Sequence, residues 1–156
     1  MEEKIDVKEA HILDIDKFLE IEKVSFKDPW SRSMFLSELE DRNRRIYYKA
    51  LINEEVAGFI GLWFIVDECH IVNIAVHPDF RNKGVAKSLV QRAVMEGGIR
   101  GVNSFTLEVR AGNEEAIKLY EGLGFMKAGY RKNYYEKERE DGIIMWLVID
   151  EEKNNG

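Results

Sequence analysis

The most informative segment of the chain is Arg81-Asn82-Lys83-Gly84-Val85-Ala86. It follows an apolar run, Ile71 to Val76, that has the composition of a strand, and it leads into a segment with the apolar period of a helix. The first N–H groups of a helix lack partners within the helix and carry the positive end of its dipole. With cationic side chains and a glycine beside them, we predict that this loop wraps a pyrophosphate group.

The segment after this loop has the clearest helical pattern in the chain. Its apolar residues recur at positions i, i+3, i+4, i+7 and i+8, namely Ala86, Leu89, Val90, Ala93 and Val94. Gly97-Gly98 predicts the end of this helix, because glycine readily adopts the left-handed conformation that closes a helix.

Taken alone, the loop leaves a second interpretation open, in which Gly84 only turns the chain and Arg81 and Lys83 are solvated cations. The loop is not a Walker loop, since the Gly-Lys-Ser/Thr ending is missing, and it does not match the G-x-G-x-x-G pattern. The sequence patterns of the other segments are therefore needed to distinguish the two interpretations.

The N-terminal segments predict a strand and two helices. Ile5 and Val7 alternate with polar residues and indicate the strand. Asp14 is a capping candidate for a first helix, whose helically spaced residues are Ile15, Phe18, Leu19 and Glu22. A proline and a serine cap start a second helix from about Ser31 to Leu39.

The middle of the chain predicts three strands, at Ile46 to Ile52, Val56 to Val66 and Cys69 to Val76. The polar breaks between them have the length of hairpin turns, so we expect the three strands to be antiparallel neighbours.

The last third predicts a strand, a helix and two more strands. Ser104 to Arg110 alternates cleanly between apolar and polar residues, and Asn113 to Glu121 has an asparagine cap and a helical pattern. The final strands, Phe125 to Lys132 and Ile143 to Ile149, are separated by a charged turn, Glu136 to Gly142.

These elements predict an α/β (α+β) fold, in which a mixed central sheet of about seven strands is flanked by about four helices. We expect a single domain over residues 1–150 and a disordered tail over residues 151–156.

Composition excludes several classes of function. The net charge of −6 argues against a general nucleic-acid binder and favours cationic partners such as basic peptides. No apolar run approaches the roughly 20 residues that span a bilayer, and the charged start is unlike a signal peptide, so a cytoplasmic location is expected. The single cysteine, Cys69, and the scattered histidines His11, His70 and His77 predict no metal site.

Several blocks of the sequence carry a resemblance to one family. The pattern Arg-x-x-Gly-x-Ala after a strand resembles the acyl-CoA pyrophosphate loop of the GCN5-related N-acetyltransferases (GNAT). Residues 107–113 (LEVRAGN) and 116–125 (AIKLYEGLGF) match the second half of that domain in order and spacing. Residues 26–31 (FKDPWS), 73–76 (NIAV) and 131–135 (RKNYY) narrow the resemblance to the RimI-type ribosomal-protein-alanine N-acetyltransferases.

This resemblance extends from roughly Ile21 to Leu147 and implies a single GNAT-like domain that uses acetyl-CoA as cosubstrate, without a metal. It implies an N-terminal peptide of a ribosomal protein as partner. From the charge and the hydropathy we expect neither nucleic acid nor membrane in direct contact. The departures are mild. Gly112 stands where the family often has serine, and Ala86 where glycine is common, so we expect modest effects on cofactor affinity.

Two residues fall on the family's catalytic positions. Without the resemblance, Glu108 is interpreted as an exposed carboxylate on a strand, and Tyr120 as a core tyrosine whose hydroxyl contacts solvent. The resemblance implies that Glu108 is the proton acceptor, acting through water, and that Tyr120 donates a proton to the departing CoA thiolate. A covalent route through Cys69 is a minor alternative, because only His70 accompanies that thiol.

The remaining candidate residues contact the cosubstrate. Asn113 has a structural role as helix cap, and the resemblance adds a polar contact to CoA. The side chains of Ile74, Ala75 and Val76 read as core strand, so their function would lie in the backbone. If the strand bulges nearby, a freed N–H group can bind the acetyl carbonyl and its developing oxyanion, as the resemblance implies.

The leading hypothesis is a direct transfer of acetyl to a protein N-terminus, most closely the N-terminal alanine of a small-subunit ribosomal protein. An α-amino group titrates near pH 8 and needs only mild help from a base. Two alternatives stay open: a broader N-terminal or small-amine acetyltransferase, and a CoA-binding regulatory module without catalysis. The presence of both Glu108 and Tyr120 speaks against the second alternative.

Overall fold

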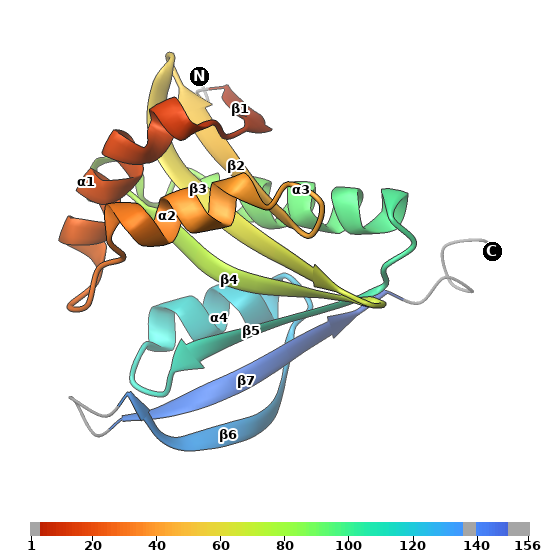
Figure 1. Ribbon diagram of the computed structural model, residues 1–156. Coiled ribbons are helices and arrows are strands. Elements are labelled where there is room, and N and C mark those ends of the chain that lie inside the picture. Colours follow the sequence, from red (N-terminus) through yellow and green to blue (C-terminus); the bar gives the residue numbers. More distant parts are fainter. Residues whose placement is uncertain (1–3, 136–139, 150–156) are drawn as a thin grey trace.

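The strands assemble into one sheet in the order β1-β2-β3-β4-β5-β7-β6, and β4 and β5 form the one parallel pair among the described strands. The computed structural model describes residues 4–135 and 140–149 (Figure 1). The strands are β1 (Ile5–Glu9), β2 (Arg45–Ile52), β3 (Glu55–Ile65), β4 (Glu68–Val76), β5 (Ser104–Arg110), β6 (Met126–Tyr135) and β7 (Glu140–Val148).

In the part of the chain that the structure describes, four α-helices accompany the sheet, as the sequence predicts. They are α1 (Ile15–Ser25), α2 (Arg32–Glu40), α3 (Val85–Ile99) and α4 (Glu114–Gly122), with the short 3-10 turns η1 (Ile12–Asp14) and η2 (Pro78–Phe80). The predicted mixed sheet of seven strands and the antiparallel order of β2, β3 and β4 are confirmed. The proposed tail, residues 151–156, lies outside the described residues.

The helices cover the two faces of the sheet in pairs, because consecutive residues of a strand point to opposite faces. On β3, Phe59 packs with α1 and α2, whereas Ile60 packs with α3 and α4. The first layer is rich in aromatic rings, and the centroids of Phe18 and Phe59 lie 4.4 Å apart. Both layers are buried, so each pair of helices is held by its own apolar cluster.

Two predicted caps are confirmed. The Ser31 hydroxyl accepts a hydrogen bond from the Met34 N–H at 3.3 Å at the start of α2, and the Asn113 side chain accepts one from the Ala116 N–H at 3.1 Å at the start of α4. Each cap satisfies one of the amides that a helix start leaves without an internal partner.

The predicted cap at Asp14 is wrong in its chemistry. Asp14 precedes α1, but its side chain makes no cap hydrogen bond and its backbone is already helical. Its carboxylate instead binds the Lys49 ammonium group at 2.9 Å and accepts the His11 N–H at 2.8 Å. Both side chains of this ion pair are largely buried, so the acid ties η1 to β2.

The predicted end of α3 at Gly97-Gly98 is also wrong, since the helix continues to Ile99. A Cβ on Gly97 would lie 2.4 Å from the Phe105 ring, so this glycine lets α3 pack closely against β5. The chain leaves the helix at Gly101, whose φ of +76° is the left-handed conformation that was assigned to the earlier pair.

The charged turn predicted over Glu136 to Gly142 is partly strand. Residues 136–139 lie outside the described residues, but Glu140 to Gly142 belong to β7. Gly142 pairs with Arg110 of β5 on one side and with Arg131 of β6 on the other. Charged residues are therefore accommodated in the strand at its first positions.

Candidate active site

A cleft opens where β4 and β5 separate. The two strands pair from Glu68 and Ser104 to His70 and Thr106, and then diverge (Figure 1). The space between them is about 1350 Å³ and is lined by residues of α1, β4, α3, β5, α4 and β7. Both diverging edges offer backbone groups that no neighbouring strand covers, so an extended ligand can hydrogen-bond there in place of a strand.

The β4 wall of the cleft carries the predicted bulge, placed two residues earlier than Ile74. Gly61 of β3 pairs with Asn73 and Leu62 pairs with Ile71, so Val72 is the extra residue. His77 donates its N–H to the Ala57 oxygen of β3 at 2.8 Å. Because N–H groups alternate along an extended strand, those of Ile74 and Val76 point to the other edge, toward the cleft.

The side chains of Ile74, Ala75 and Val76 are hydrocarbons that join the two apolar clusters, Ala75 as a buried residue and Ile74 and Val76 as half-buried ones. Ala75 is 6% exposed and belongs to the cluster under α1 and α2, whereas Ile74 and Val76 pack against the cluster under α3. Any part that these three residues play in the chemistry therefore belongs to their backbone.

The loop at the start of α3 borders the same cleft. Asn82 and Gly84 both have left-handed backbones, with φ of 62° and 84°, and a Cβ on Gly84 would meet nothing within 4 Å. Gly84 is thus required by its backbone conformation and leaves open space in front of the first helical amides. Arg81, Asn82, Gly84, Val85 and Ala86 line the cleft, and Lys83 is not among its lining residues.

Two further cationic side chains line this end of the cleft, and the sequence alone did not identify them as site residues. Lys87 lies on the first turn of α3 and Lys118 on α4, and both side chains are exposed. Together with Arg81 they make the α3–α4 end of the cleft basic, which suits a phosphorylated ligand.

Glu108 and Tyr120 meet at this cleft from different elements. Glu108 lies on β5, opposite Ile144 of β7, and is half-buried. Tyr120 lies on α4, is 6% exposed and packs edge-on against Phe125, with 5.8 Å between the ring centroids. Burial raises the pKa of the Tyr120 hydroxyl, so the phenol stays protonated at neutral pH and is available as a donor.

Asn113 lines the cleft while it caps α4, so both roles predicted for it are geometrically compatible. Cys69, in contrast, is completely buried and does not line the cleft. Burial raises the pKa of its thiol to about 12, which leaves almost no thiolate at neutral pH. The structure thus argues against the covalent alternative.

The opposite end of the cleft holds a polar group that the sequence did not reveal. Glu22 of α1 is 1% exposed and lines the cleft beside Asn73 of β4 and the segment Phe26 to Trp30. A charged residue on the apolar face of α1, four positions after Phe18, was the available signal.

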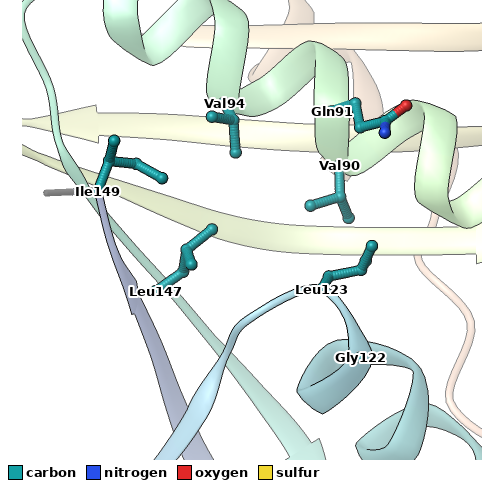
Figure 2. A pocket seen from close by; sticks show the side chains of 7 residues that line it. All are labelled: Val90, Gln91, Val94, Gly122, Leu123, Leu147 and Ile149. Atoms are coloured by element: carbon teal, nitrogen blue, oxygen red, sulfur yellow. The ribbon is translucent and has the colours of Figure 1, made fainter. Parts of the chain in front are cut away.

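A smaller hollow of about 350 Å³ lies between α3, the end of α4 and β7 (Figure 2). Its lining is mainly aliphatic, and the side chains of Val90, Leu123 and Leu147 converge in the close-up. None of the described residues that line this hollow is ionisable, and we therefore assign the candidate chemistry to the larger cleft.

Comparison with known proteins identifies the family to which the chain belongs. Residues 15–125 match the Acetyltransferase (GNAT) family. The chain belongs to this family. As a GNAT protein, it is an acetyl-CoA-dependent N-acetyltransferase, and the open, basic loop at Gly84 fits the cosubstrate's pyrophosphate.

Individual relatives narrow the similarity within the GNAT proteins. The bS18-alanine N-acetyltransferase of Escherichia coli (strain K12) is 38% identical over 138 residues, which are 87% of this chain and 92% of the relative. A Bacillus subtilis (strain 168) protein that carries the same name provisionally is 35% identical over 97% of this chain and 100% of its own.

Solved structures agree with this similarity. The crystal structure of the E. coli ribosomal-protein-S18-alanine N-acetyltransferase has a TM-score of 0.86 at 36% identity, over 94% of this chain and 95% of that one. Ard1 from Thermoplasma volcanium shares the fold at 24% identity, with a TM-score of 0.86 over 94% of this chain and 98% of that one.

Within residues 4–135 and 140–149, no group of three or more His, Cys, Asp or Glu side chains is placed to hold a metal ion. In that same part of the GNAT chain, no helix is long and apolar enough to cross a membrane.

Proposed function

We propose that this chain acetylates the N-terminal alanine of a small-subunit ribosomal protein, the bS18 class, in the cytoplasm. The similarity to relatives of that name over almost the whole chain carries the proposal. The convergence of Glu108 and Tyr120 on one cleft supports it, because acetyl transfer to an amine needs both a proton acceptor and a proton donor.

In the proposed mechanism the acceptor amine approaches from the Glu22 end of the cleft and the thioester from the basic end. Glu108 takes a proton from the acceptor ammonium group through water, which leaves a neutral nucleophile. The N–H groups of Ile74 and Val76 are candidates to stabilise the developing oxyanion, since they point into the cleft.

The second half of the reaction breaks the C–S bond as the new C–N bond is completed. As the C–N bond forms, the attacking nitrogen releases its second proton to solvent water, and Tyr120 donates its hydroxyl proton to the leaving thiolate. The Tyr120 oxygen then regains a proton from solvent. Arg81, Asn82, Lys83, Gly84, Val85 and Ala86 are proposed to hold the pyrophosphate, with Asn113 as a further polar contact to CoA. Lys83 is the weakest member of this set, since it does not line the cleft.

Mass spectrometry on a panel of peptides tests the acceptor. The chain is incubated with acetyl-CoA and with peptides that begin with alanine, serine or methionine, together with an alanine peptide whose α-amine is blocked. We expect the free alanine peptide to have the highest kcat/KM and the blocked peptide to stay unmodified. Equal kcat/KM for all free N-termini, or faster acetylation of small amines, would favour the broader-specificity alternative.

A further inference from the structure

Glu22 is a carboxyl group buried in an apolar part of the molecule. Its neighbours on α1, Phe18 and Ile21, belong to the aromatic cluster under α1 and α2, and Glu22 itself is 1% exposed. Burying a carboxylate is costly unless hydrogen bonds replace its water. Desolvation raises the pKa of Glu22, whereas the hydrogen bonds to its oxygens act in the opposite direction.

Those hydrogen bonds come from two separate segments. The Asn73 side-chain amide donates to Oε1 of Glu22 at 2.5 Å, and the backbone N–H of Trp30 donates to Oε2 at 3.4 Å. Both oxygens are therefore acceptors, one toward β4 and one toward the connection between α1 and α2. Glu22 thus joins α1 and the connection that follows it to β4, which lies 51 residues further along the chain.

Each of the two partners sits at a position that matters for acetyl transfer. Asn73 directly follows the bulge residue Val72 and precedes Ile74, whose N–H points into the cleft. Trp30 ends the segment Phe26 to Trp30, which lines the cleft, and its ring packs on Phe35 with centroids 5.4 Å apart. A shift in the Glu22 carboxyl group would move the segment relative to the bulge.

We propose that Glu22 is a positioning residue for the acceptor, which fixes the segment Phe26 to Trp30 against the β4 bulge so that the incoming amine meets the thioester carbonyl. This inference rests on the proposed function, because it concerns the acceptor end of the same cleft. Small displacements of a bound reactant lower rates strongly, so a rigid junction at this point has a direct kinetic consequence.

A second buried acid supplies a matched control. Glu38 of α2 is 5% exposed, forms an ion pair with Arg45 and accepts a hydrogen bond from the Tyr47 hydroxyl at 3.2 Å. It lies on the helix that packs against α1 but does not line the cleft. Removing its charge should disturb packing in the same layer without touching the acceptor end.

The donor and acceptor roles of the Glu22–Asn73 pair allow a swap experiment. In Glu22→Gln one carboxyl oxygen becomes an NH₂ group, which faces a donor at either partner. Adding Asn73→Asp restores a complete set, because the new amide then donates to the new carboxylate while its oxygen still accepts from Trp30. Steady-state kinetics are measured with peptide and acetyl-CoA varied separately.

We expect Glu22→Gln to lower kcat/KM for the peptide about 10- to 100-fold, through kcat as well as KM, and to change the KM for acetyl-CoA less than about twofold. The double variant should recover most of the loss. Glu38→Gln should lower the melting temperature but leave kcat and both KM values unchanged. Asn73→Ala removes the same hydrogen bond from the strand side, so its kcat/KM for the peptide is the test if Glu22→Gln does not fold.

The outcomes separate this inference from the proposed function. A folded Glu22→Gln, or Asn73→Ala in its place, whose kinetics equal those of Glu38→Gln would overturn the positioning role while wild-type activity stands. An equal loss toward both substrates, without recovery in the double variant, would show a purely structural residue. A wild-type chain that acetylates none of the peptides would contradict the proposed function itself, and the positioning role with it.

Discussion

At the scale of single residues, Glu108 and Tyr120 are separated by their different dependence on pH. Glu108→Gln keeps the shape of the side chain and removes the carboxylate that we propose as the base. We expect kcat/KM to fall by roughly 10²-fold or more near neutral pH, within the range of general acid–base catalysis. The loss should shrink above about pH 8, where the α-amine is already neutral. A pH–rate profile of the folded variant measures this, and wild-type rates at neutral pH would contradict the assignment.

Tyr120→Phe removes only a hydroxyl group from a buried ring. Because burial keeps this phenol protonated, the role that we propose for it is proton donation, and raising the pH should not restore the lost turnover. We expect unchanged acetyl-CoA affinity by calorimetry and a lower kcat. Near-wild-type kcat in a folded variant would make Tyr120 a packing residue, with the thiolate protonated by water.

At the scale of secondary-structure elements, the loop before α3 makes the sharpest prediction. Gly84 has φ of +84° and open space where a side chain would stand. A bulky residue there should weaken CoA binding by occupying the space in front of the helix start. We expect Gly84→Trp and Arg81→Glu to lose at least about tenfold in calorimetric affinity, with binding that weakens as salt is added. Unchanged affinity in a folded Gly84→Trp would refute the pyrophosphate assignment.

The helices and strands show which features of the fold the sequence alone could predict. The helices and strands were predictable because their apolar periods and caps are local, as Ser31 and Asn113 illustrate. The sequence wrongly predicts a helix end at Gly97, because this glycine packs against the Phe105 ring. A close contact between two elements is not visible in the local sequence pattern. Asp14 was misread for the same reason, since Lys49 lies 35 residues away.

For the candidate site as well, residues in contiguous sequence blocks could be predicted, whereas residues that depend on contacts distant in the sequence could not. Glu108, Tyr120 and the loop could be named because they stand in contiguous blocks that resemble a family. The position of Glu22 in the cleft could not be named, because its partner Asn73 lies 51 residues away and the bulge that presents Asn73 depends on pairing with β3. Contacts of this kind require the three-dimensional arrangement.

At the scale of the whole molecule, the net charge of −6 predicts a preference among acceptors. An acidic body attracts cationic peptides and repels acidic ones over a distance of about 8 Å at physiological ionic strength. We expect neutral and cationic N-terminal peptides to have higher kcat/KM than acidic ones, and the difference to shrink with added salt. Peptides that differ only in the charge of their later residues measure this, and a salt-independent preference would point to direct contacts instead.

In the proposed function, this cleft acetylates the α-amine of a protein N-terminus. A single peptide that carries both a free N-terminal alanine and an internal lysine tests this selectivity, with tandem mass spectrometry to locate the acetyl group. At neutral pH the neutral fraction of an α-amine exceeds that of a lysine amine by about 10²- to 10³-fold. We expect the wild-type protein to acetylate the α-amine alone. Equal acetylation of the lysine and the N-terminus by the wild-type chain would contradict it.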